Sequence, residues 1–153
     1  MNKKIIMLSV LFLSLLFITG CGNKTMIDTN EFKNKTNENG YTYTDVTSQF
    51  KDSVFIKEAS IAGSIDGWQI EFYTLEDQNY ASSMFEKNKL EFDNERGASS
   101  IKTSSSGKNY DRYSLTTSDL YMYLSRIDNT LIYVKENVKN KDAISEFIKD
   151  LGY

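Results

Sequence analysis

The stretch LYMYLSRIDNTLIYVKE, residues 120–136, alternates aliphatic residues with tyrosines and is divided by Asp128-Asn129. Successive side chains of a strand point to opposite faces of a sheet, so this alternation predicts strands. Aspartate and asparagine suit the backbone of a tight turn, which joins two antiparallel strands. We therefore expect strands at Leu120–Ile127 and Thr130–Glu136 in an antiparallel sheet.

Strand-like and helical patterns surround this hairpin on both sides. The first helix is expected to begin at Asp28, because Asp28 and Glu31 have the spacing of a capping box, and to end at Asn39-Gly40. Apolar residues at helical period predict two more helices, at about 77–96 and 141–151. The segment 104–107 is rich in serine and is expected to be a loop. The other predicted strands are 41–46, 54–62, 68–74, 99–103 and 110–115.

This order of elements predicts the α+β class, with an antiparallel sheet and helices on one face. A shift of 62 residues also matches several positions, including Ile70 with Ile132 and Phe85 with Phe147. The match suggests an internal α-βββ-α-βββ-α pseudo-repeat. The alternative is the patterning that any strand followed by a helix shares.

The N-terminal residues have the features of a secretion signal. Lys3 and Lys4 precede an uncharged run from Ile5 to Ile18, which is too short to span a bilayer comfortably. The run ends in Ile18-Thr19-Gly20-Cys21, which resembles the lipobox of bacterial lipoproteins with a type II signal peptide.

The lipobox resemblance implies cleavage after Gly20 and a diacylglyceryl group on Cys21. Residues 1–20 are then a removed signal peptide, 21–27 a lipidated cysteine with a short tether, and 28–153 one globular domain. The alternative is an ordinary signal peptide with a chance cysteine. Cys21 is the only cysteine of the chain, so it has no partner for an internal disulfide. We therefore expect attachment to the extracytoplasmic face of the cell membrane.

Composition argues against several kinds of chemistry. The chain has no histidine, so Ser-His-Asp and Cys-His catalysis are excluded, and neither a zinc site nor a cofactor is expected. The signal holds two of the 18 basic residues and none of the 21 acidic ones, so the mature chain is acidic. An acidic protein is a poor partner for nucleic acid. We expect no nucleic-acid partner, no metal site and no enzymatic activity.

Tyrosines on three predicted strands form the candidate binding surface. If helices cover the aliphatic face of the sheet, the tyrosines line the other face. Amphipathic aromatic surfaces are common in recognition. The alternative is that tyrosine simply suits half-exposed strands. The candidate residues are Tyr73, Tyr121, Tyr123 and Tyr133.

The mature domain resembles the small lipoproteins of Gram-positive bacteria whose function is uncharacterised. The resemblance lies in 39–41, 69–73, 125–133 and 150–153, and it transfers no active site. We expect a non-enzymatic module that binds a protein or small molecule at the membrane surface. The alternatives are a structural or immunity-type lipoprotein and a wall hydrolase with two convergent carboxylates. The acids considered for the hydrolase are Glu71, Glu76, Asp77, Glu91, Asp93 and Glu95.

Overall fold

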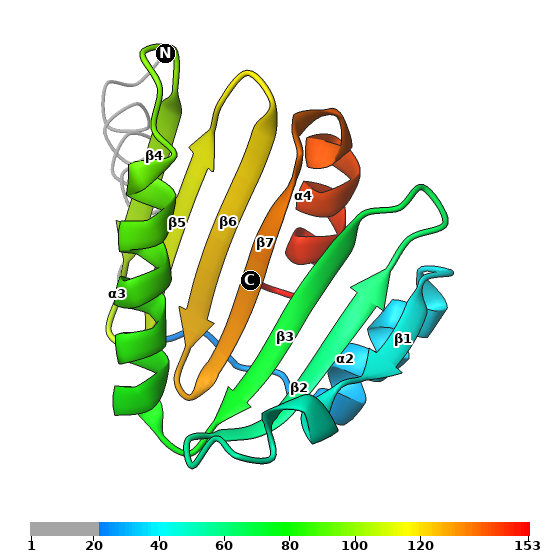
Figure 1. Cartoon of the computed structure of the whole chain (residues 1–153). Helices are drawn as coiled ribbons and strands as arrows, with labels where there is room; N and C mark the ends of the chain where they lie inside the picture. Colours follow the sequence, from blue (N-terminus) through cyan, green and yellow to red (C-terminus); the bar gives the residue numbers. More distant parts are fainter. Residues whose placement is uncertain (1–21) are drawn as a thin grey trace, which may run out of the picture.

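The computed structural model describes residues 22–153, and within them the chain forms one seven-stranded antiparallel sheet with three α-helices (Figure 1). The predicted α+β class is confirmed. The lipobox and the signal peptide lie outside the described residues. In chain order the elements are α2 (Thr29–Glu38), β1 (Thr42–Asp45), the 3-10 helix η2 (Thr47–Phe50), β2 (Ile56–Gly63), β3 (Gln69–Leu75), α3 (Gln78–Asn94), β4 (Ile101–Ser106), β5 (Tyr110–Thr116), β6 (Leu120–Ile127), β7 (Thr130–Asn137), the 3-10 helix η3 (Val138–Asn140) and α4 (Lys141–Asp150).

The sheet consists of two meanders that meet in its interior. Its strand order is β1-β2-β3-β7-β6-β5-β4, and every neighbouring pair is antiparallel. Helix α3 carries the chain from β3 to the far edge, and β4 to β7 return strand by strand until β7 pairs with β3. The predicted hairpin is confirmed: Ile127 pairs with Thr130, and Asp128 takes a left-handed φ of 49° in the turn.

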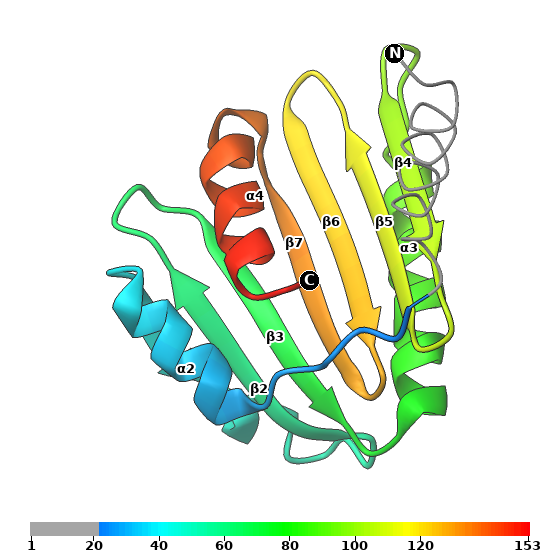
Figure 2. The same cartoon turned by 180° about the vertical axis from the view of Figure 1, so that it is seen from behind.

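The helices cover both faces of the sheet, so the expectation that they share one face is wrong. Helix α3 lies on one face, while α2 and α4 lie on the other (Figures 1 and 2). Each face has its own core. On β3, Phe72 packs under α2 and α4, whereas its neighbour Tyr73 belongs to the core beside α3. On β7, Ile132 and Leu131 divide in the same way. Strands that are apolar at both odd and even positions need cover on both sides.

Local capping signals place the helices as expected. The side chain of Asp28 accepts a hydrogen bond from the Glu31 N–H at 2.8 Å and begins α2. Gly40, just after the helix, has a φ of 76°, a conformation that glycine adopts at little cost. The side chain of Asp77 accepts hydrogen bonds from two backbone N–H groups and begins α3.

The serine-rich segment 104–107 is mostly strand, so the loop expected there is wrong. Ser104 to Ser106 complete β4, and the turn follows at 107–109. β4 is an edge strand in which all six residues are exposed, so it lacks the apolar alternation that identifies a buried strand. The other edge, β1, has only four residues.

The structure does not support a symmetric internal repeat. The matched strands β3 and β7 lie side by side, but the matched helices α3 and α4 lie on opposite faces. A two-fold axis between antiparallel neighbours would leave both helices on the same face. In addition, Ala81 is buried while its match Ala143 is exposed.

The segment 22–27, expected as a short tether, packs against the domain. The backbone N–H of Lys24 donates to Asn109 Oδ1 at 2.9 Å, and Asn109 Nδ2 donates to the Lys24 carbonyl at 2.8 Å. Ile27 is buried in the core under α2 and α4. Figure 2 shows the segment crossing that face towards α2. Among residues 22–153, no helix has the length and apolarity needed to cross a membrane.

Candidate functional site

The four candidate tyrosines lie on opposite faces of the sheet, so the single tyrosine surface is wrong. Tyr73 and Tyr133 face the α3 side, whereas Tyr121 and Tyr123 face α2 and α4. The register explains the division: across the β6–β7 hairpin Tyr123 pairs with Val134, and Tyr133 pairs with Leu124. Because paired residues point to the same face, the tyrosines of β6 and the tyrosine of β7 point to opposite faces of the sheet.

Tyr121 and Tyr123 are largely part of the core on the α4 side. Tyr121 is buried and its hydroxyl accepts a hydrogen bond from Ser145 Oγ of α4 at 3.2 Å. Its ring lies 6.3 Å from the ring of Tyr123, which is half-buried. Burial raises the pKa of both hydroxyls, so both stay neutral at ordinary pH. This pair is a poor candidate for contact with a partner.

On the opposite face, Tyr73 contacts both the half-buried carboxylate of Glu71 and the ring of Phe50. The Tyr73 hydroxyl donates a hydrogen bond to Glu71, and the Tyr73 ring meets Phe50 edge-to-face at 5.7 Å. Burial raises the pKa of the Glu71 carboxyl, although the Tyr73 hydrogen bond opposes the shift. Burial also raises the pKa of Tyr73 and Tyr133. The sheet thus carries one acid–tyrosine pair beside Phe50.

Phe50 also lines an open groove between α3 and the connection from η2 to β2. The groove has a volume of about 530 Å³. The rings of Phe55 and Tyr80 stack across it, with centroids 5.7 Å apart and planes 17° from parallel. We call it the apolar groove, and its lining residues are Phe50, Ser53, Phe55, Ile56, Tyr80, Ser83, Met84, Lys87 and Asn88.

Two local features of the sequence form the apolar groove. Asp77 begins α3, which places Tyr80 on its first turn and Met84 one turn later on the same side. The predicted strand 54–62 begins late, at Ile56, so Val54 and Phe55 remain in the connection and are exposed. The groove is not apparent from the sequence because Val54 and Phe55 continue the strand pattern. The only sequence feature that could have indicated the groove is the presence of aromatic residues on both sides of the polar segment 51–53.

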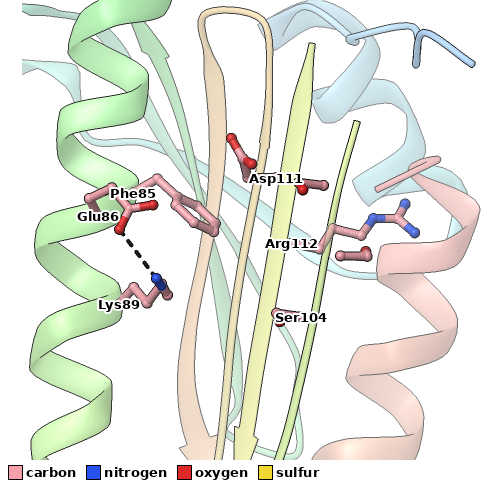
Figure 3. A pocket seen from close by; sticks show the side chains of 8 residues that line it. Phe85, Glu86, Lys89, Ser104, Asp111 and Arg112 are labelled. Atoms are coloured by element: carbon pink, nitrogen blue, oxygen red, sulfur yellow. Dashed lines mark hydrogen bonds and ion pairs between the residues drawn. The ribbon is translucent and has the colours of Figure 1, made fainter. Parts of the chain in front are cut away.

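A second, more polar pocket lies between α3 and the β4–β5 hairpin, with a volume of about 290 Å³ (Figure 3). Both of its acids already contact cations. Glu86 pairs with Lys89 at 3.3 Å, and Asp111 accepts two hydrogen bonds from Arg126, at 2.5 and 3.0 Å. Arg112 points away from α3 and donates to the Gly152 carbonyl at 3.3 Å. Both acids of this pocket are paired within the fold, and Arg112, whose Nε is buried without a hydrogen-bond partner among the described residues, is directed elsewhere, so the pocket is the weaker candidate.

Most of the acids considered for catalysis have structural partners. Glu76 pairs with Lys57 at 3.2 Å, and Glu95 pairs with Lys135 at 2.7 Å. Asp93 accepts hydrogen bonds from Lys102 at 2.9 Å and from the Tyr113 hydroxyl at 2.8 Å. Asp77 caps α3 and Glu71 binds Tyr73. In the part of the chain that the structure describes, no three acids or cysteines gather to hold a metal.

Comparison with known proteins gives no further assignment: no family model, no curated protein and no solved structure matches this chain. The function is therefore inferred from the geometry of the described residues and from the sequence of the N-terminal segment.

Proposed function

We propose that this chain is an extracytoplasmic lipoprotein, held at the cell membrane by lipid on Cys21, which binds an apolar ligand in the apolar groove. The observation that carries the proposal is the groove itself. Its volume of about 530 Å³ lies within the usual ~300–1,000 Å³ of small-molecule sites. The proposal replaces the tyrosine face, since Tyr121 belongs to the core on the α4 side and Tyr123 packs against that core.

The chemistry of the lining favours an apolar occupant. Phe55 and Tyr80 remain 37% and 42% exposed although their rings stack on each other. Met84 contributes a flexible thioether that adapts to different shapes. The groove lining contains one cation, Lys87, and no acid. An occupant would thus gain mainly from removal of apolar surface from water, with Lys87 available for a polar end.

A neutral fluorescent probe, N-phenyl-1-naphthylamine, tests the groove directly. Ser83 is an exposed groove residue of α3, so Ser83→Trp should fill the groove without disturbing the core. We expect this variant to weaken probe binding about ten-fold, which corresponds to about 1.4 kcal/mol. Leu90→Trp is the matched control, because Leu90 is 65% exposed on the same helix and does not line the groove. Equal probe affinity in both variants would contradict the proposed site.

The anchor is tested separately in cells. Cys21→Ser removes the only sulfhydryl that can carry the lipid. We expect the native chain in the membrane fraction, with acyl chains detected on its N-terminal peptide by mass spectrometry. The variant should lose that modification. An unmodified Cys21 in a native chain that still has residues 1–20 would refute the lipoprotein assignment.

A further inference from the structure

The apolar groove and the start of the described chain lie at the same end of the sheet. Backbone hydrogen bonds link the connections along this end: Asp128 N–H to the Asn109 carbonyl, Leu75 N–H to the Asn129 carbonyl, and Glu76 N–H to the Phe55 carbonyl, each at 2.8 Å. We call this end the anchor end. It is the lower end in Figure 1, where the β6–β7 turn and the β3–α3 connection lie.

The chain enters the fold at one corner of the anchor end. Asn109 holds the backbone of Lys24 through two hydrogen bonds, and Lys24 Nζ donates to the Gly152 carbonyl at 3.2 Å. Cys21 precedes Lys24 by three residues, which reach at most about 10 Å when fully extended. A lipid on Cys21 therefore brings this corner close to the membrane and leaves the domain little freedom to move away.

The other corner of the anchor end presents apolar side chains. Val54 is 85% exposed, and the stacked rings of Phe55 and Tyr80 lie beside it. We call these three residues the apolar tip. Strand β2 follows the tip in the chain, and strand β5 follows Asn109. In the sheet order, β2 and β5 are four strand positions apart. At about 4.8 Å between strands, the two corners are about 19 Å apart along one end of the sheet.

We propose that the apolar tip rests in the interfacial layer of the lipid bilayer, as a second contact beside the lipid on Cys21. This inference rests on the proposed membrane anchor. A flat surface that lies at the Lys24 corner can also touch the tip, because both corners belong to the same end of one sheet. Aromatic side chains with one polar end suit the boundary between headgroups and acyl chains. The apolar groove then opens beside the bilayer, and lipid acyl chains are the ligand class it meets.

Depth-dependent quenching tests the orientation. The mature chain is coupled through Cys21, its only cysteine, to a maleimide lipid in phosphatidylcholine vesicles whose acyl chains carry bromine. Tryptophan is placed at the tip by Val54→Trp. The matched control is Ile65→Trp, because Ile65 is fully exposed in the β2–β3 turn, at the opposite end. The native Trp68 is buried and lies next to that same turn, so it gives a constant background.

We expect bromine to reduce the added fluorescence of Val54→Trp by about half or more, because a side chain in the acyl boundary contacts the quencher. Ile65→Trp should be unaffected. Iodide in the water gives the reverse test: coupling to vesicles should shield the tryptophan at 54 and leave the one at 65 accessible. No bromine quenching at position 54, or equal quenching at both positions, would overturn the inference.

The design separates this inference from the proposed function. Because the lipid is attached chemically, absence of lipid on Cys21 in cells would refute the proposed anchor without changing the quenching result. Loss of probe binding in Ser83→Trp concerns the apolar groove alone. A tip that is quenched beside a groove that binds no probe would support the membrane contact and reject the ligand site.

Discussion

Phe32→Ala should detach α2 from the sheet. Phe32 is fully buried and its ring stacks on Phe72 of β3, with centroids 4.7 Å apart and planes 11° from parallel. A second contact reaches Phe147 of α4, at 6.4 Å between centroids. Only one other residue of α2, Thr36, is buried. The helix therefore depends on a single aromatic side chain for most of its packing.

The expected loss of stability follows from this burial. Truncation of a fully buried phenylalanine to alanine costs about 3–5 kcal/mol, which includes the cavity that is left behind. The total stability of such a domain is about 5–15 kcal/mol. Unfolding entropy near the midpoint is about 0.28 kcal/mol per kelvin for a domain of this size, so the melting temperature should fall by about 11–18 °C.

Urea unfolding measured by circular dichroism and by Trp68 fluorescence gives the free energy of unfolding. Trp68 belongs to the same core as Phe32, so its fluorescence reports on the affected region. Leu90→Ala, at an exposed position of α3, is the control and should change stability by less than about 0.5 kcal/mol. A Phe32→Ala variant within about 1 kcal/mol of the native protein would show that α2 is held by something other than this ring.

Three further predictions concern single polar groups. Burial raises the pKa of Glu71 in the folded state above its value in the unfolded state. The native protein should therefore lose stability as pH rises from the unfolded to the folded pKa of this group. Urea titrations across about pH 4–8 should show that Glu71→Gln is more stable than the native protein at neutral pH. Asp111→Asn leaves the buried guanidinium of Arg126 without its anion and should cost about 3 kcal/mol in the same assay. Asn109→Ala removes the two hydrogen bonds between the Asn109 side chain and the backbone of Lys24, and hydrogen exchange in segment 22–27 should quicken while the central strands stay protected. Unchanged pH dependence, stability or exchange, respectively, would contradict each one.

Elements with local signals were predictable from the sequence. Asp28 and Gly40 bracket α2 because capping needs only neighbouring backbone groups, and Asp128-Asn129 specifies a turn between adjacent strands. The class of fold followed from the order of these elements. The prediction of a loop at the serines of β4 was wrong because an edge strand that is exposed throughout has no apolar face by which its sequence can be recognised.

The faces of the sheet were not predictable because they depend on pairing between distant strands. β3 lies next to β7, and Phe72 pairs with Ile132, 60 residues later in the chain. The sequence of each strand does not indicate which of its two apolar sides packs against α3. A single covered face would place the candidate tyrosines on one surface, but the register of β6 and β7 divides them between the two faces.

The apolar groove escaped prediction for a related reason. Phe50 and Phe55 precede a strand, and Tyr80 lies in the first turn of a helix, so each has an adequate local role. Only the tertiary structure brings the three rings to one side of α3. The exposure of Phe55 and Tyr80 is a property of that arrangement, and sequence periodicity does not report it.

The two edges of the sheet affect association between copies of the protein if the proposed anchor holds many copies on one membrane. Anchored proteins diffuse in two dimensions in a common orientation, so strand edges of neighbouring copies meet far more often than they do in solution. An unpaired edge is a template for intermolecular pairing. Here one edge is the four-residue β1, and the other is β4, whose six residues are all exposed and include three serines and Lys102. If the proposed lipid anchor holds many copies on one membrane, we expect crowded copies to remain separate, so that each groove stays open.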